Sequence, residues 1–327
     1  MEPIDAKTVG AVAARFQLPR APVEKALRLV TFIEECAKDA FLKDRLVLKG
    51  GTALNLFYGD FARLSIDADF DYIGAIEKTK MQKEHDRVIA RLDEVGVDLG
   101  FSPELAMDAY AGATLFFRYE TLFGSQDLIK ADVNFLNRLP ILGKTVPRAA
   151  SIGLGDERTT VPCLVLDEIA GLKLGTLCVR AAPRDLFDVA RFAELALDRD
   201  RVRKIALFRG FLESLDLELF DPGAASRIKP SDLKKEVYTL LRDRRQPTRE
   251  EMMAAATPWL SALLPLRDRE KEFQTMLLKG KADATLLFDP FAVHDRINDH
   301  PALLRRIGVK KPSAREGRVA RRFPPQK

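Results

Sequence analysis

Cysteine, histidine and tryptophan are scarce in this chain of 327 residues, and their scarcity excludes several kinds of site. The three cysteines, Cys36, Cys163 and Cys178, are too few and too far apart for a disulfide framework or a zinc site, and they fit a reducing cytoplasm. Because there are only three histidines, a metal site or a triad built on histidine is not expected. The charged side chains must therefore carry any chemistry.

Long apolar runs are also absent, so the sequence predicts no membrane span, which needs about 18 consecutive apolar residues. The first twenty residues include Glu2, Asp5 and Lys7 and have no apolar core, so we expect no secretory signal. Hydrophobic residues make up 46% of the chain and charged residues 31%, which is typical of a globular protein. We therefore expect a cytoplasmic protein.

The net charge of +5 is unevenly distributed along the chain. Residues 303–327 hold nine lysines and arginines and one acidic residue, a balance of +8, whereas the remaining residues together carry −3. Residues 309–327 are rich in Lys, Arg and Pro and are predicted to be disordered. Such a tail either increases solubility or contacts a polyanion, and the sequence leaves both interpretations open.

The length suits two domains, and the pattern of residues changes near position 164. Before this point the sequence predicts a mixed α/β half, and after it a mainly helical half. The predicted helices of the first half are 22–38, 52–58 and 75–95, and its predicted strands are 45–49, 66–73, 113–119 and 128–136. In the second half we expect a helix with Asp167 as its N-cap, a helix beginning at Pro183, and helices over 201–281 with breaks near residues 221–223 and 246–247.

The predicted strand 66–73 carries an acidic residue at every second position, so Asp67, Asp69 and Asp71 share one face. Asp132 occupies an equivalent position on the predicted strand 128–136. If these strands are neighbours, Asp67, Asp69 and Asp132 converge, and a hard oxygen cage without histidine suits Mg²⁺ or Mn²⁺. Alternatively, an Asp-x-Asp pattern marks a solvated strand face, which is the commoner case.

The pair Gly50-Gly51 precedes a predicted helix and follows a short predicted strand. Glycines allow backbone N–H groups to approach phosphate oxygens, and Thr52 and Ser65 offer hydroxyl groups nearby. Such a pair is more often only a tight turn. Its combination with the acidic strands is more specific, and it indicates a nucleoside triphosphate (NTP) held beside divalent metal.

A second charged cluster lies in the helical half. Lys173 and Arg180 share one helical stripe, and Asp185 and Asp188 share one face of the next helix. A surface network of ion pairs is one interpretation. In the other, Lys173 neutralises the triphosphate and Asp188 assists at the acceptor hydroxyl, with Arg180 and Asp185 beside the nucleotide.

Four segments resemble motifs of the AbiEii/AbiGii toxin-type nucleotidyltransferases, which belong to the DNA polymerase β-like superfamily. The first combines Lys49-Gly50-Gly51-Thr52-Ala53-Leu54-Asn55 with Arg63-x-Ser65-x-Asp67-x-Asp69. The others are Lys130-Ala131-Asp132, residues 172–180, and Arg184-Asp185-Leu186-Phe187-Asp188. Together they cover about residues 50–190, and we find no further family motif beyond 200.

The resemblance implies a bilobed α/β (α+β) fold with a polymerase β-like mixed sheet flanked by helices and a cleft between the lobes. The expected parts are a nucleotidyltransferase lobe over 1–163, a helical lobe over 164–308 and the basic tail 309–327. The resemblance also implies roles for individual residues. These are metal ligands (Asp67, Asp69 and a third carboxylate, Asp132), triphosphate contacts (Gly50, Gly51, Ser65), a nucleotide-binding cation (Lys173) and a catalytic acid (Asp188).

The function implied by the resemblance is transfer of a nucleotide from an NTP to RNA, with the tRNA 3′ end as the expected acceptor. It also implies a cognate AbiEi-type antitoxin in a bacterial toxin–antitoxin or phage-defence module. Two alternatives remain open at this stage. The acceptor could be a protein or a small molecule, or the chain could be a non-catalytic module that binds RNA or a partner on the same scaffold.

Overall fold

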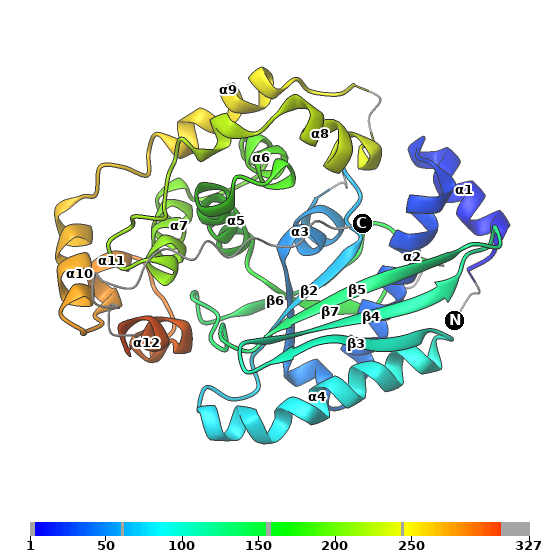
Figure 1. The fold of residues 1–327 in the computed structure, drawn as a ribbon, viewed down its shortest axis with the longest axis horizontal. Coiled ribbons are helices and arrows are strands. Elements are labelled where there is room, and N and C mark those ends of the chain that lie inside the picture. The colour runs from blue at the N-terminus through cyan, green and yellow to red at the C-terminus, as the bar shows by residue number, and fades with distance from the viewer. Residues whose placement is uncertain (1–3, 60–61, 155–157, 243–244, 309–327) are drawn as a thin grey trace, which may run out of the picture.

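The computed structural model describes residues 4–59, 62–154, 158–242 and 245–308. Within these ranges, seven strands form one mixed sheet in the order β3-β4-β5-β2-β1-β7-β6 (Figure 1). The strands are β1 (Leu46–Lys49), β2 (Asp67–Tyr72), β3 (Ser102–Ala109), β4 (Gly112–Glu120), β5 (Gln126–Asn134), β6 (Thr145–Ala149) and β7 (Thr160–Leu164).

The helices of the described ranges fall into two groups, before and after β7. The first group is α1 (Ala6–Phe16), α2 (Arg20–Lys38), the short α3 (Gly50–Thr52), which continues as a π-helical segment over Ala53–Tyr58, and α4 (Lys78–Asp98). The second group is α5 (Leu166–Arg180), α6 (Pro183–Ala190), α7 (Arg199–Glu213), α8 (Pro230–Glu236), α9 (Arg249–Leu260), α10 (Asp268–Leu278), α11 (Ala284–Phe288) and α12 (Pro301–Gly308). None of these helices is long and apolar enough to cross a membrane.

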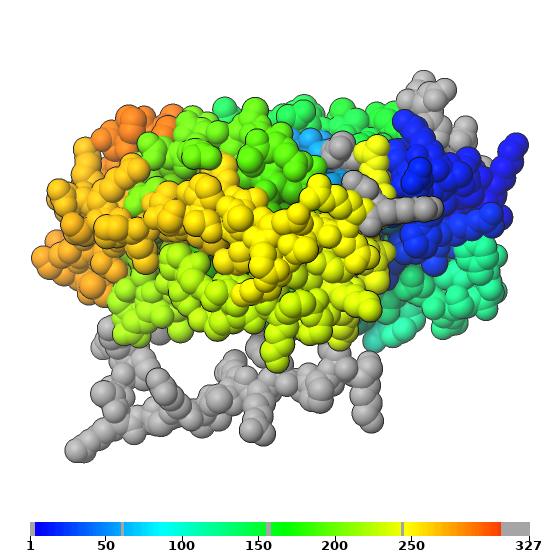
Figure 2. Space-filling model, turned by 90° about the horizontal axis from the view of Figure 1, so that it is seen from above, coloured from blue at the N-terminus to red at the C-terminus, as the bar shows by residue number. Residues whose placement is uncertain are grey.

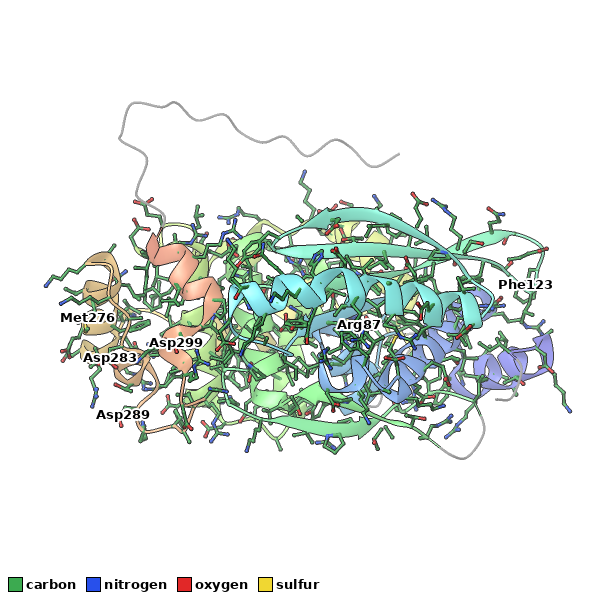
Figure 3. The ribbon with its side chains drawn as sticks, turned by 90° about the horizontal axis from the view of Figure 1, so that it is seen from below. Arg87, Phe123, Met276, Asp283, Asp289 and Asp299 are labelled. Atoms are coloured by element: carbon green, nitrogen blue, oxygen red, sulfur yellow. The ribbon has the colours of Figure 1, made fainter. Side chains whose placement is uncertain are left out.

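Alternation along the strands gives the sheet one apolar and one polar face. On the apolar face, Phe117 of β4 stacks on Phe32 of α2 with ring centroids 4.5 Å apart, and it also packs beneath Gly96 of α4. The side chains of Ala68, Phe70 and Tyr72 in β2 are buried. Figure 3 shows α4, marked by Arg87, lying across the sheet. Because α2 and α4 cover this face, the intervening polar residues of β2 and β5 point to the other one.

The order of strands places β2 and β5 side by side in parallel. The register pairs Asp69 with Asp132 and Asp67 with Lys130. On its other side, β2 pairs with β1 in antiparallel orientation, so that Lys49 lies opposite Asp69. The adjacency of the two acid-bearing strands, on which the sequence-based metal hypothesis depends, is therefore confirmed.

Helices α5 and α7 form the centre of the helical half and approach closely through glycines. A Cβ at Gly171 would lie 2.5 Å from Ile205 Cβ, and one at Gly175 would lie 2.8 Å from the Ala206 carbonyl oxygen. Figure 2 shows the later helices, α9 and α10, as a yellow and orange surface along one side of an elongated molecule. In Figure 3, the β4–β5 turn at Phe123 and the α10 residue Met276 lie near opposite ends.

The chain returns from the helical half to the sheet half near residue 241. Leu64 N–H donates to the Leu240 carbonyl at 2.8 Å, and Arg242 N–H donates to the Ala62 carbonyl at 2.8 Å. These bonds fix the segment that leads into β2, including Arg63, against the helical half.

The predicted strands at 45–49, 66–73, 113–119 and 128–136 correspond to β1, β2, β4 and β5, and the predicted helices 22–38 and 75–95 to α2 and α4. The prediction of Asp167 as an N-cap is wrong, because α5 begins at Leu166 with Val165 as its cap. Asp167 lies within the first turn and accepts hydrogen bonds from Arg201 and from the Asp198 N–H. The predicted disordered tail, 309–327, lies outside the described residues, and the division into domains stays a prediction.

Candidate active site

The Gly50-Gly51 turn directly follows β1. Gly50 has a φ of +73°, in the left-handed region that glycine adopts without strain. A Cβ at Gly50 would overlap the Asp69 carboxylate and lie 3.0 Å from Asp69 Cβ. A Cβ at Gly51 would lie 3.6 Å from Lys173 Nζ. The turn therefore fits between the acidic face of β2 and a lysine of the helical half.

Asp69 lies against this turn and differs from its acidic neighbours in having no ion pair or hydrogen bond to its carboxylate within the described ranges. Burial raises the pKa of Asp69, although Lys49 and Lys173 act to lower it. By contrast, Asp67 lies 3.4 Å from Arg184 Nη1, and Asp132 accepts hydrogen bonds from Thr114 at 2.5 Å and Lys130 at 2.6 Å. Asp69 is therefore the carboxylate most available to a cation.

Asp71, at the end of the same strand face, is 3% exposed and pairs with Lys49 Nζ at 2.5 Å. This buried pair joins β1 to β2, so the Asp71 carboxylate is already occupied by a structural ion pair.

Five side chains of alternating charge form a ladder between the two halves: Arg63, Asp188, Lys173, Asp185 and Arg180. Arg63 holds Asp188 through two hydrogen bonds, from Nε to Oδ1 at 2.9 Å and from Nη2 to Oδ2 at 2.8 Å. Lys173 Nζ lies 3.0 Å from Asp188 Oδ2 and donates to Asp185 Oδ1 at 2.9 Å. Arg180 Nε donates to Asp185 Oδ2 at 2.8 Å. The sequence-predicted cluster is thus an inward-facing network that includes Arg63 from the segment before β2.

The buried members of this ladder remain charged, whereas Arg180 at its outer end is exposed. Burial opposes ionisation of Asp188, but Arg63 and Lys173 outweigh it and hold the pKa of Asp188 far below its ordinary value. Burial likewise opposes the charge of Lys173, whereas Asp185 and Asp188 raise its pKa above the usual range. A cation is therefore fixed beside Gly51 at any physiological pH.

Two residues of this network have no role in the sequence-based site. Arg63 is 1% exposed, and Asn55 donates to the Gly51 carbonyl at 3.0 Å and to Asp188 Oδ1 at 3.2 Å. Both occur in the first family-like motif, which is the signal that could have identified them. They connect the glycine turn to Asp188, so the turn and the ladder form one unit.

The hydroxyls of Thr52 and Ser65 lie beneath the turn. Thr52 is fully buried and its Oγ1 is bonded to Ser65 Oγ at 2.8 Å and to the Asp67 carbonyl. Ser65 is 6% exposed, and its Oγ would lie 3.3 Å from a Cβ at Gly51. These contacts fix the turn relative to β2. They also bring the Ser65 hydroxyl close to Gly51, the glycine that faces Lys173.

A cleft of about 510 Å³ collects most of the predicted nucleotide-binding residues. Its lining includes Lys49, Gly50, Asp69, Lys173, Thr176, Arg180 and Asp185. A volume of this size suits a small-molecule ligand. Of the predicted site residues outside this lining, Asp67, Asp132 and Asp188 adjoin the cleft through their neighbours in β2, β5 and α6. Gly51, Thr52 and Ser65 lie at the adjacent glycine turn.

The carboxylate oxygens of Asp67, Asp69 and Asp132 are chemically suited to binding a divalent cation. Asp67 and Asp69 share one face of β2, and Asp132 lies directly opposite Asp69. In the part of the chain that the structure describes, however, no three Asp, Glu, His or Cys side chains are grouped closely enough to hold a metal ion. The reason is that Asp132 turns to Thr114 and Lys130, while Asp67 faces Arg184.

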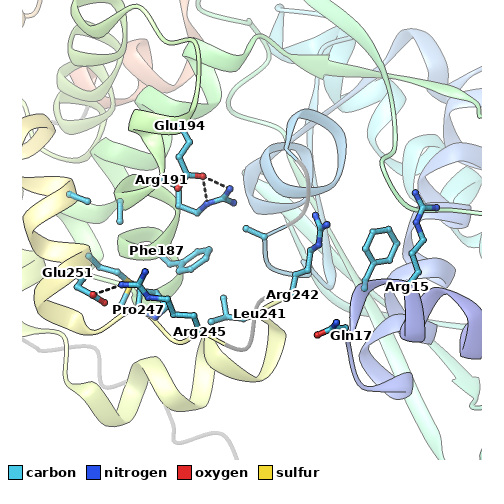
Figure 4. Close-up of a pocket in the computed structure, with 15 residues that line it drawn as sticks. Arg15, Gln17, Phe187, Arg191, Glu194, Leu241, Arg242, Arg245, Pro247 and Glu251 are labelled. Carbon is cyan, nitrogen blue, oxygen red and sulfur yellow. Dashed lines mark hydrogen bonds and ion pairs between the residues drawn. The ribbon is translucent and has the colours of Figure 1, made fainter.

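A larger cavity, of about 880 Å³, lies between α1, the end of α6 and the segment leading into α9 (Figure 4). Four arginines line it: Arg15, Arg191, Arg242 and Arg245. Two acids share the lining, Glu194 bonded to Arg191 and Glu251 bonded to Arg245. None of the predicted catalytic residues lines this cavity, so it is a separate basic surface.

Comparisons with known proteins identify a matching family and similar folds. A family model described as nucleotidyl transferase AbiEii toxin, type IV TA system, matches residues 31–281. The chain is similar in structure to MenT4, a nucleotidyltransferase toxin from Mycobacterium tuberculosis H37Rv, with 21% identity and a TM-score of 0.62 over 91% of this chain and 99% of that one. It is also similar to JHP933 from Helicobacter pylori, with 19% identity and a TM-score of 0.47 over 75% of this chain and 94% of that one. A search of curated proteins found no match. The similarity to MenT4 confirms the predicted fold class.

Proposed function

We propose, from the premise that this chain belongs to the AbiEii family of nucleotidyl transferase toxins of type IV toxin–antitoxin systems, that it transfers a nucleotide from an NTP to an RNA acceptor. The expected acceptor is the 3′ end of tRNA. An acceptor hydroxyl oxygen bonds to the α-phosphorus while the bond from that phosphorus to the pyrophosphate oxygen breaks. The hydroxyl proton passes to solvent, and pyrophosphate leaves.

One observation carries this proposal: Lys173 and the Gly50-Gly51 turn lie next to each other, with Asp69 on the other side of the turn. A triphosphate placed along the turn has backbone N–H groups within reach and a fixed ammonium group against its charge. Phosphoryl transfer depends mostly on positioning and charge stabilisation, so these are the groups that the reaction requires.

Asp67 and Asp69, with Asp132 as the third carboxylate, are the residues that would hold Mg²⁺ or Mn²⁺. When bound, the metal would neutralise phosphate charge and lower the barrier to attack. The adjacent turn would keep the Asp69 carboxylate oriented, and Asp67 would exchange its contact with Arg184 for the cation.

We assign Lys173 to the β- and γ-phosphates and Arg180 to the outer part of the triphosphate, with Asp185 holding both cations in place. The sequence suggested that Asp188 acts on the acceptor proton. Its strongly depressed pKa and its contacts to Arg63 and Lys173 instead support a positioning role, because such a carboxylate is a poor base.

A polyanionic acceptor is favoured over a protein side chain by the basic surfaces of the molecule. The arginine-lined cavity and the excess of positive charge in residues 303–327 both attract phosphodiesters. The family also implies an antitoxin, which we propose is of the AbiEi type, in a cytoplasmic module that serves phage defence.

Incorporation of label from each of the four α-³²P-labelled NTPs into total tRNA, with Mg²⁺, tests the proposal. The wild type should label tRNA with at least one NTP, and EDTA should abolish the signal. The Asp69→Ala variant should lose labelling by about a hundredfold or more, since a metal-binding carboxylate is removed. Asp86→Ala is the matched control, because this α4 carboxylate is 97% exposed and lies outside the cleft.

Label that appears in the protein and not in RNA would replace the RNA acceptor by a protein one. Absence of label from every NTP, together with absence of NTP binding, would refute the enzymatic function.

A further inference from the structure

The C-terminal helix α12 is fixed against α7 by buried contacts. His300, at its start, is 2% exposed and makes an edge-to-face contact with Phe208 of α7, with ring centroids 5.4 Å apart. Leu303 is fully buried, and Arg306 Nε donates to the Leu212 carbonyl at 2.9 Å, at the end of α7. The position of α12 is therefore set by packing.

This anchored helix forms part of the wall of the nucleotide cleft. Ala302, Arg305 and Arg306 line the same cleft of about 510 Å³ that contains Gly50 and Lys173. Figure 1 shows α12 beside the ends of β3 and β5. The helix lies outside residues 31–281, which the family model matches, so this part of the cleft is not represented in that match.

Arg305 is the exposed arginine of this wall. Its guanidinium makes no hydrogen bond or ion pair to any described residue, in contrast to Arg306, which is bonded to Leu212, and to Arg209, which pairs with Glu213. It borders both the nucleotide cleft and a neighbouring cavity that contains Tyr110 and Arg138. An arginine in this position has five donors available to a ligand.

Besides the charged residues around Lys173, the cleft lining contains apolar and neutral polar side chains. Leu136, Leu172 and Leu212 supply apolar surface, Asn134 and Asn137 are neutral polar side chains, and Arg209 and Glu213 neutralise each other in an ion pair. Asn134 Oδ1 is already used by the N–H groups of Leu136 and Asn137. Apolar side chains with a planar guanidinium suit the face and edge of a nucleobase better than a phosphate.

We propose that α12 closes the base end of the NTP site and that Arg305 contacts the nucleobase of the incoming nucleotide. The inference rests on the proposed function, which places the triphosphate at Gly50-Gly51 and Lys173. The base then extends along the cleft toward Leu136 and Leu212, and Arg305 stacks on it or donates to its acceptor atoms. Arg305 is thereby a determinant of NTP affinity and of the choice among NTPs.

Binding of the four Mg²⁺-NTPs and of Mg²⁺-tripolyphosphate to the full chain, measured by isothermal titration calorimetry, tests this inference. The Arg305→Gln variant should bind the preferred NTP about tenfold more weakly, as expected for loss of a charged hydrogen-bond donor, while its affinity for tripolyphosphate stays unchanged. Lys173→Gln should weaken both ligands. Arg20→Gln is the control, because Arg20 is an exposed arginine that lines neither the cleft nor its neighbouring cavity.

The possible results separate the inference from the proposed function. If the wild type binds an NTP and Arg305→Gln binds it equally well, the base-end assignment is wrong and the transferase proposal stands. If Arg305→Gln loses tripolyphosphate binding to the same extent as NTP binding, Arg305 is a phosphate contact and the assignment is again overturned. A wild type that binds no NTP would remove both the inference and its premise.

Discussion

Both the backbone conformation at Gly50 and its close contact with Asp69 require a glycine at this position. Substitution by Ala places a Cβ at a φ of +73° and drives it into the Asp69 carboxylate. We expect Gly50→Ala to lose about 1–2 kcal/mol of stability from the strained backbone and to lose activity almost entirely, because Asp69 must move. Urea denaturation and NTP incorporation into tRNA measure the two effects.

Gly124 provides a matched control for this substitution. Its φ is +77°, and a Cβ there meets no heavy atom within 4 Å. Gly124→Ala should therefore show a similar loss of stability with normal activity. If Gly50→Ala were as active as Gly124→Ala, the close contact with Asp69 would have no functional meaning.

Asp188 is predicted to contribute to the stability of the fold as well as to the active site. The Asp188→Asn variant leaves Arg63 buried without its ion-pair partner, while Lys173 keeps Asp185. It should lower the free energy of unfolding by about 3–5 kcal/mol, as observed when one partner of a buried ion pair is removed. Thermal or urea denaturation measures this loss.

The matched comparison for Asp188 is Glu104→Gln, which removes an ion pair to Arg118 in which both side chains are about half exposed. This variant should lose less than about 1 kcal/mol. Equal, small losses in both variants would show that the ladder does not contribute to stability in the way its burial implies.

The residues of the site differ in how far the sequence could reveal them. The shared face of Asp67, Asp69 and Asp132 could be predicted from alternation along their strands, and the pairing of β2 with β5 agrees with it, while their role as metal ligands stays a prediction. Arg63 could not be assigned a partner, since its ion pair to Asp188 spans 125 positions and leaves no local pattern. The availability of Asp69 also depends on tertiary contacts, which occupy its neighbours and leave its carboxylate unpaired.

At the scale of elements, the first turn of α5 is bound to the segment after β5 through Glu168. Its carboxylate accepts hydrogen bonds from the N–H groups of Ile141 at 2.8 Å and Leu142 at 3.0 Å. Burial raises the pKa of Glu168 to about 7 in spite of these donors. Lys173 lies on the same helix, so this contact also orients the cation of the cleft.

The raised pKa of Glu168 predicts a pH dependence of stability. A carboxyl group that is protonated more readily in the folded state stabilises it most below its unfolded pKa, near 4.5, and this contribution is lost as the pH rises toward 7. The loss amounts to about 3 kcal/mol for a shift of this size. Urea denaturation between pH 4.5 and 7.5 should show a smaller decline for Glu168→Gln than for the wild type.

Glu218→Gln, at an exposed position, should retain the wild-type profile over the same pH range. If Glu168→Gln also retained it, Glu168 would not be the titrating group.

Three strands were not predicted from the sequence, and each has a physical reason. Strand β3 is an edge strand with mostly exposed side chains and Pro103, so it shows no apolar alternation. Strands β6 and β7 carry Pro147 and Pro162, which face each other across the pair at the opposite edge of the sheet. Pro is tolerated at such edges, where a missing N–H does not interrupt a central ladder. The four strands without proline, β1, β2, β4 and β5, were predicted from the sequence.

At the scale of the whole molecule, the cleft draws on segments that are far apart in the chain. Gly50, Lys173 and Arg305 line one cleft although more than 250 positions separate the first from the last. The ladder and the bonds between residues 62–64 and 240–242 hold the two halves together around it. A substitution that destabilises the helical half should therefore also disturb the nucleotide cleft.

The charge distribution along the chain predicts how an RNA acceptor is held. Residues 309–327 carry seven of the lysines and arginines and one acidic residue, whereas residues 1–302 are slightly negative overall. If the segment contacts tRNA phosphates, its lysines and arginines displace counterions. Each contact then adds about 0.9 to the magnitude of the slope of log affinity against log salt for duplex nucleic acid.

A variant with all seven of these lysines and arginines replaced by Gln should bind tRNA more weakly at low salt. Its slope should be reduced by several units, while NTP binding remains normal. Filter binding between 50 and 300 mM KCl measures the slope, and an unchanged value would leave solubility as the role of the segment and the arginine-lined cavity as the RNA-binding surface.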